Sequence, residues 1–135
     1  MSSGTPHQQA YTPPIPALEI GLEDPDGEQT IGPLTAVLDT GADISLIPIT
    51  LLEQIKAPEQ DEVRLRSHWG EATPFTTYLI SIQVGAETLP GIEVVGDLYG
   101  QEVLLGRDVL NKLLLLIDGP QQRTDVLSQR PRRLV

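Results

Sequence analysis

Apolar and polar residues alternate along several stretches of the chain, which is the pattern of β-strands with one buried face. Residues 18–23 alternate in this way, and residues 63–66 do so again after a polar segment. A third stretch has its apolar residues on one face, and these are Tyr78, Ile80, Ile82 and Val84. Because Gly70 lies in the turn between the second and third stretches, the pattern predicts a β-hairpin there.

Other apolar stretches do not alternate, which is typical of strands that are covered on both faces. These stretches are residues 34–38, 44–47, 102–105 and 114–117. Residues 88–95 predict a further strand, and Pro90 with Gly91 inside it indicates an edge or a bulge. Residues 24–27, Asp-Pro-Asp-Gly, predict a tight turn.

Helical spacing is confined to short segments. Residues 50–55 suit a single helical turn, and residues 107–113 place Val109, Leu110 and Leu113 at helical spacing. Residues 56–62 are expected to form a polar loop. The chain is therefore predicted to be mostly β, with one short helix near its C-terminal part.

The two ends differ in composition from the middle of the chain. Residues 1–16 are rich in Pro and Ser and predict a flexible leader, while residues 121–135 form a basic C-terminal tail. The tail holds one acid against four arginines, and we expect a solvated, partly disordered end rather than a docking or autoprocessing segment. Residues 17–120 remain as the predicted domain.

Length and composition exclude several classes of protein. At 135 residues the chain can bury one core, and its net charge of −10 argues against nucleic acid or an anionic membrane as partner. The chain has no cysteine, which excludes thiolate catalysis and disulfides. Residues 113–117 are the longest apolar run and are too short to span a bilayer, and no signal-peptide pattern is present at the start. We therefore expect a cytoplasmic protein.

Candidate chemistry lies where an apolar strand runs into the segment Asp39-Thr40-Gly41. Asp and Gly are poor strand residues, so a tight turn is expected to hold the Asp39 carboxylate between apolar walls. A carboxylate in such a place gains hydrogen bonds, binds a cation or shares a proton with a second acid. An ordinary hairpin turn would also suit these residues.

Two segments together carry a resemblance to a known family. Leu38-Asp39-Thr40-Gly41-Ala42-Asp43 resembles the active-site motif of the retropepsin-like aspartic proteases, and residues 103–110, with Gly106 and Arg107, resemble the apolar-Gly-Arg element that follows it in that family. The resemblance covers roughly residues 18–117 and is closer to a cellular or bacterial homologue than to a viral enzyme. It implies a single-domain closed β fold that acts as a homodimer, because the chain holds only one such motif.

The resemblance also implies a role for each residue of the motifs. Asp39 from each of two chains would activate a water, with an extended peptide or protein as substrate and no metal or other cofactor. The flap that closes over substrate would carry Trp69 and Gly70, although Trp69 could equally fill the core. The residues implied to support the active site are Thr40, Gly41, Ala42, Asp43, Gly106 and Arg107, among which Asp43 and Arg107 would form a bracing ion pair.

Other residues whose side chains could act in catalysis or metal binding are expected to have structural roles. His68 is expected to be a surface residue of the flap, and with His7 it makes too few histidines for a metal site. Asp118 follows an apolar run but lacks the adjacent hydroxyl residue, which favours an ordinary turn. Two alternatives to a protease stay open: a non-catalytic dimerisation or peptide-binding module of the same fold, and a self-masked precursor whose ends must be trimmed.

Overall fold

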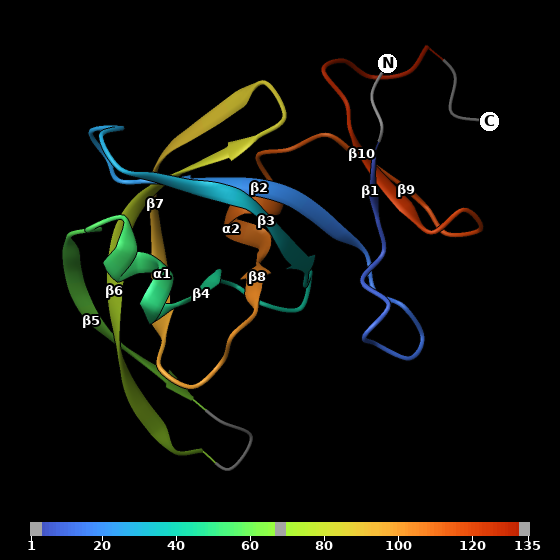
Figure 1. Cartoon of the computed structure of the whole chain (residues 1–135). Helices are drawn as coiled ribbons and strands as arrows, with labels where there is room; N and C mark the ends of the chain where they lie inside the picture. The colour runs from blue at the N-terminus through green and yellow to red at the C-terminus, as the bar shows by residue number, and fades with distance from the viewer. Residues whose placement is uncertain (1–3, 67–69, 133–135) are drawn as a thin grey trace.

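The computed structural model of the protein describes residues 4–66 and 70–132, and its body is a seven-stranded β-sheet (Figure 1). The order of the strands is β2-β3-β8-β4-β7-β6-β5, and β2 pairs with β6 as well as with β3. This second pairing closes the sheet on itself, so the prediction of a mostly β fold is confirmed. The strands are β2 (Ala17–Glu23), β3 (Thr30–Leu38), β4 (Leu46–Pro48), β5 (Glu59–Arg66), β6 (Ala72–Val84), β7 (Glu87–Asp97) and β8 (Val103–Leu105).

The alternating pattern of the sequence explains which faces are buried. In β6 the four residues predicted to share one face are all buried, and the apolar residues of β2 face the same core. Burying one such aliphatic side chain stabilises the fold by about 1.5–3 kcal/mol. The largest buried side chains of this core are Leu18, Leu22, Ile47, Leu52, Ile55, Ile80, Ile82 and Leu105.

Two short helices lie among the described residues, where the fold prediction had one. α1 (Ile49–Gln54) follows β4 directly and buries Leu52 completely. α2 (Arg107–Leu110) follows β8 and buries Val109, but it ends three residues before the predicted end at Leu113. Helices this short are stable only through tertiary packing, so propensity does not fix their number or length. Within the described ranges, neither helix is long and apolar enough to cross a membrane.

The predicted polar loop at residues 56–62 is wrong from Glu59 onward. β5 begins at Glu59 and pairs antiparallel with β6, as far as Arg66 opposite Ala72. β5 lies at the edge of the sheet, and its first four residues are all polar and exposed. An edge strand is held by ladder hydrogen bonds and needs no alternating apolar face, so hydropathy gives little sign of it.

The β5–β6 hairpin occupies the place in the chain where the flap was predicted. Gly70 has a φ of +82°, which suits a turn that only glycine adopts easily. The predicted flap residues His68 and Trp69 lie outside the described residues.

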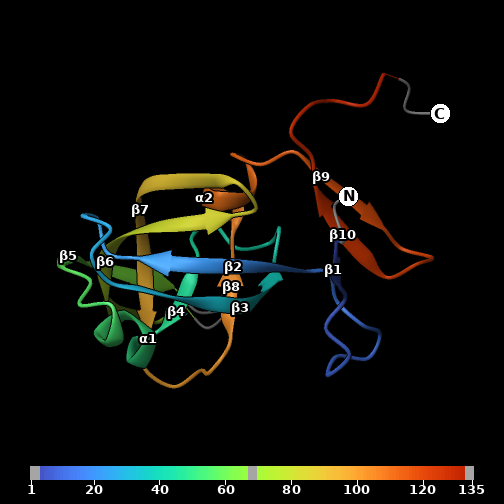
Figure 2. The ribbon, with the colours of Figure 1, turned by 45° about the horizontal axis from the view of Figure 1, so that its top comes forward.

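A second, three-stranded sheet lies beside the body and joins the two ends of the chain (Figure 2). It consists of β1 (Thr5–Pro6), β10 (Arg123–Val126) and β9 (Leu115–Asp118), with β10 in the middle. The leader and the tail, which were expected to be flexible or disordered, thus each contribute a strand, and Thr5 lies opposite Thr124.

The strand predicted to be buried at residues 114–117 is β9, and that prediction is wrong for two of its side chains. Leu116 is 46% exposed and Ile117 is 48% exposed. The β9–β10 hairpin extends away from the seven-stranded sheet in Figures 1 and 2, and only some of its side chains, such as Leu115 and Val126, pack against the core. β9 is also an edge strand of its sheet.

Candidate active site

The turn that carries Asp39 begins where two parallel strands end side by side. β3 and β8 are parallel, with Leu38 opposite Leu105. The Asp39 backbone N–H donates to the Leu105 carbonyl oxygen at 2.9 Å, and the Ala42 N–H closes the turn onto the Asp39 carbonyl oxygen at 3.2 Å. The backbone of Asp39 is therefore fixed at the end of the sheet while its side chain is only partly buried.

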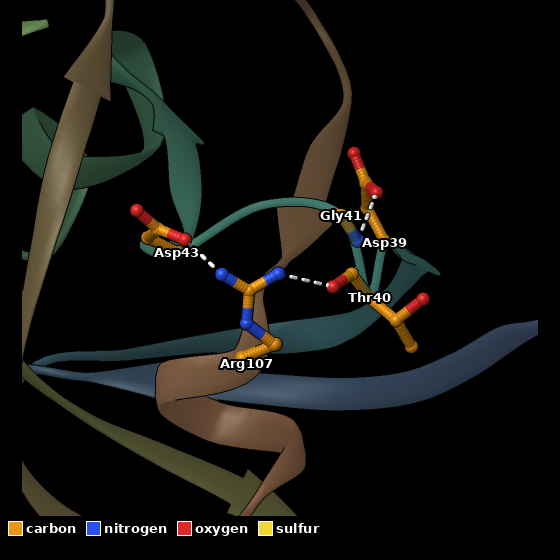
Figure 3. A network of polar contacts seen from close by, with 5 residues as sticks. All are labelled: Asp39, Thr40, Gly41, Asp43 and Arg107. Carbon is orange, nitrogen blue, oxygen red and sulfur yellow. Dashed lines mark hydrogen bonds and ion pairs between the residues drawn. The ribbon is translucent and has the colours of Figure 1, made fainter.

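The Asp39 carboxylate is oriented by the turn itself. The Gly41 N–H donates to Asp39 Oδ1 at 2.9 Å (Figure 3). A Cβ atom at position 41 would lie 3.2 Å from the same oxygen, and Gly41 does not have a positive φ. A side chain at position 41 would therefore crowd the Asp39 carboxylate, and glycine avoids this contact.

Arg107 joins the two sides of this turn, as Figure 3 shows. Its Nη1 donates to the Thr40 carbonyl oxygen at 2.5 Å, and its Nη2 forms an ion pair with Asp43. The side chains of Arg107 and Asp43 are 44% and 86% exposed, and an exposed ion pair contributes at most about 1 kcal/mol. The contact therefore acts on the shape of the turn more than on the stability of the fold.

The backbones of the two motifs are also in direct contact. The Arg107 N–H donates to the Ala42 carbonyl oxygen at 2.9 Å. A Cβ atom on Gly106 would lie 2.9 Å from that oxygen and 3.0 Å from the Ile44 carbonyl oxygen. Only glycine allows this approach, which explains the residue type at position 106.

A buried polar network behind the turn contains residues that the motifs did not single out. Ser45 Oγ donates to Asp108 Oδ1 at 2.7 Å and accepts a hydrogen bond from the Gly106 N–H at 2.9 Å. Ser45 is completely buried. The sequence indicated this network only weakly, because Ser45 is one hydroxyl residue inside an otherwise apolar run. A polar group in such a run needs a hydrogen-bond partner when it is buried.

Residues of the leader also approach the turn that carries Asp39. The Tyr11 hydroxyl donates to the Glu102 carboxylate, and Glu102 directly precedes β8. This hydrogen bond raises the pKa of Tyr11, and desolvation and the negative charges of Glu102 and Asp39 raise it further. The Pro16 carbonyl oxygen accepts a hydrogen bond from the Leu38 N–H at 3.0 Å, so the leader ends against the residue before Asp39.

Two of the remaining candidates lie apart from this turn, and the third is part of it. His7 is buried beside the second sheet, where its N–H donates to the Gln122 carbonyl oxygen. Asp118 Oδ1 accepts a hydrogen bond from the Gln121 N–H, as expected for an ordinary turn. Thr40 is exposed, and its side chain points away from Arg107 in Figure 3. Among the described residues there is no group of three or more His, Cys, Asp or Glu that could hold a metal ion.

A comparison with protein families gives one match. The model of the family described as "gag-polyprotein putative aspartyl protease" matches residues 30–112 of the chain. The matched segment runs from the first residue of β3 to just beyond α2, and it includes both motifs and the β5–β6 hairpin. No curated protein matches the chain.

Proposed function

The chain belongs to the family of gag-polyprotein aspartyl proteases, and from this premise we propose that it is an aspartic endopeptidase whose two Asp39 carboxyl groups come from two copies of the chain. The observation that carries the proposal is the Asp39 carboxylate, held by the Gly41 N–H at the end of β3 and left partly exposed. Arg107, the nearest motif cation, is already engaged by Thr40 and Asp43. The carboxylate is thus oriented and has room for a second acid.

A second copy of the chain is the simplest source of that acid. A two-fold axis through the turns would bring the same residue from each chain to one place. A groove of about 770 Å³ on the single chain is lined mainly by residues of β1, β2, β3, β6 and β10 and by no residue of the turn that carries Asp39. The substrate cleft is therefore proposed to form between two chains.

The proposed chemistry follows from the proximity of two carboxyl groups. At a separation of about 3 Å they cannot both ionise, so the pair keeps one proton and titrates as a unit. The ionised carboxylate takes a proton from water, whose oxygen attacks the peptide carbonyl carbon while the carboxylic acid protonates the carbonyl oxygen. The tetrahedral intermediate then loses the amine, which takes a proton from the carboxyl group that had received one from water, while one hydroxyl group of the intermediate returns its proton to the other carboxylate. The products are a free acid and a free amine.

The other predicted residues take supporting parts in the proposal. The exposed Thr40 hydroxyl would reach the partner chain, and the exposed Leu116 and Ile117 on the open edge of β9 would add apolar contact between chains. The substrate would lie extended between the catalytic turns and the β5–β6 hairpins, where Trp69 and Gly70 are proposed to contact it. The predicted cytoplasmic location stays a prediction that cell fractionation would test.

The test is cleavage of a diverse peptide mixture by the wild type and by Asp39→Asn, at high protein concentration and several pH values. We expect cleavage by the wild type alone, with a rate that rises faster than linearly with protein concentration and an optimum at acidic to mildly acidic pH. Equal cleavage by both proteins, or a rate that rises steadily into the alkaline range, would overturn the proposed mechanism.

A further inference from the structure

The Tyr11–Glu102 pair lies beside the catalytic turn, where both of its chain segments are fixed. The leader forms a loop closed by hydrogen bonds between Gln8 and Ile15 at 2.8 and 3.2 Å, and Tyr11 lies at the far side of this loop. Glu102 precedes the strand whose Leu105 carbonyl oxygen holds the Asp39 N–H. Glu102 comes three residues before Leu105, which is about 10 Å along an extended strand, and the Asp39 charge acts on the Tyr11 hydroxyl, so the pair lies near the turn that carries Asp39.

The Glu102 carboxylate is incompletely paired. Its side chain is half-buried, and the Tyr11 hydroxyl occupies only one of its two oxygens. Within residues 4–66 and 70–132, no cation pairs with it. A carboxylate that is partly removed from water gains from a cationic partner, so the second oxygen is suited to an ammonium or guanidinium group.

The Tyr11 ring supplies the other half of such a site. The residue is 37% exposed, so part of its ring remains accessible. An aromatic ring next to a carboxylate suits lysine and arginine, because the aliphatic stem or the cation packs on the ring while the charge meets the acid. The Tyr11–Glu102 contact holds both groups in place before a ligand arrives.

Building on the proposed function, we propose that Tyr11 and Glu102 form a subsite beside Asp39 that accepts a lysine or arginine side chain of the peptide substrate. The raised pKa of Tyr11 is consistent with this site, because the hydrogen bond to Glu102 raises it most, and desolvation and the negative charges of Glu102 and Asp39 add to the effect. The net charge of −10 would in addition favour the encounter with basic peptides.

The experiment uses the full chain and peptides built on one cleaved sequence, which carry Lys, Met or Glu at each of the three positions on either side of the cleaved bond. We expect the wild type to prefer the Lys peptide at one of these positions, with a preference that shrinks as salt is added. Glu102→Gln should reduce kcat/KM for that peptide about fivefold and leave the Met peptide unchanged, as the loss of one partly exposed ion pair implies.

Three further variants and a control separate an effect on binding from an effect on folding. Glu102→Lys should invert the preference toward the Glu peptide, which an unfolded protein could not do. Tyr11→Phe keeps the ring and should retain most of the preference, whereas Tyr11→Ala should lose it. Glu28→Gln makes the same chemical change in the exposed turn between β2 and β3 and should change nothing. A Lys preference that Glu102→Gln and Glu102→Lys leave intact would overturn the subsite.

The subsite can be tested even if the proposed hydrolysis is not observed. Binding of the Lys and Glu peptides to Asp39→Asn would be measured by fluorescence anisotropy, with and without Glu102→Gln. If the double variant binds the Lys peptide more weakly than Asp39→Asn does, and binds the Glu peptide no more weakly, the subsite is supported. Equal binding of the Lys peptide by the two proteins overturns it. The proposed function is tested by a different result: it would be overturned if no cleavage depended on Asp39, whatever the binding measurements show.

Discussion

The Asp108 carboxylate accepts two hydrogen bonds from Ser45, one from the hydroxyl at 2.7 Å and one from the backbone N–H at 3.1 Å. These bonds connect the residue before β4 to α2, although the two lie 63 positions apart in the sequence. Because Ser45 also accepts the Gly106 N–H, the pair fixes the two motifs against each other from behind.

Asp108→Ala is expected to destabilise the fold by about 1–3 kcal/mol, because it leaves the N–H and the hydroxyl proton of buried Ser45 without an acceptor. Urea denaturation of the wild type and the variant measures the change. Asp26→Ala, in the exposed turn after β2, is the matched control and should stay within about 0.5 kcal/mol of the wild type. A loss of equal size in both variants would mean that the Ser45 network has no special part in stability.

Arg107→Ala should abolish most peptidase activity while lowering stability by less than about 1 kcal/mol, since the ion pair with Asp43 is exposed. Arg107→Lys should restore little, because an ammonium group cannot bridge Asp43 and the Thr40 carbonyl as the planar guanidinium does. Kinetics and denaturation of the same samples measure both effects. Full activity in Arg107→Ala would show that the turn keeps its shape without this contact.

Leu116→Glu is expected to weaken self-association, because it places a charge on the exposed apolar side of the β9 edge. Activity should then fall at low protein concentration and recover at high concentration, while thermal stability measured on the dilute protein changes little. Sedimentation velocity gives the association state. Ala86→Glu, in the exposed turn between β6 and β7, is the control, and an equal effect of both changes would remove β9 from the proposed interface.

The raised pKa of Tyr11 predicts a loss of stability at alkaline pH. The folded protein keeps the Tyr11 proton to a higher pH than the unfolded chain, whose pKa is near the ordinary value of 10.0. The contribution of protonated Tyr11 to the free energy of unfolding is therefore fully present below pH 10.0, and it is lost as the pH rises through the pKa of Tyr11 in the folded protein. The denaturation midpoint of Tyr11→Phe should fall less over this range than that of the wild type, and parallel curves would contradict the prediction.

Removal of residues 1–14 tests whether the leader masks the site. The structure gives the leader β1 and the Tyr11–Glu102 contact, so we expect the shortened chain to be less stable and no more active. Cleavage assays and thermal denaturation of both forms measure this. A rise in activity after removal would instead favour the self-masked precursor.

The parts of the site that could be predicted from the sequence lie in contiguous motifs. Asp39, Gly41 and Arg107 each belong to a short motif, so two short segments were enough to single them out, although Arg107 contacts Thr40 and Asp43 at separations of 67 and 64 positions. Tyr11 and Glu102 are 91 positions apart, and a side-chain contact over such a separation leaves no periodic signal in either segment. The three-stranded sheet was missed for the same reason, because its strands are short and come from opposite ends of the chain.

The pairing of β1 with β10 also decides how the protein responds to mechanical force. The pair is antiparallel, with Thr5 opposite Thr124 and Pro6 opposite Arg123, so the N-terminal end of β1 lies on the side where β10 leads to the C-terminus. A pull on both chain ends therefore acts on one hydrogen bond at a time. Strands whose hydrogen bonds break one after another separate at a lower force than strands whose hydrogen bonds are all loaded together in shear. Tension on the ends would therefore peel β1 from β10 first, while the closed seven-stranded sheet and the turn that holds Asp39 stay intact.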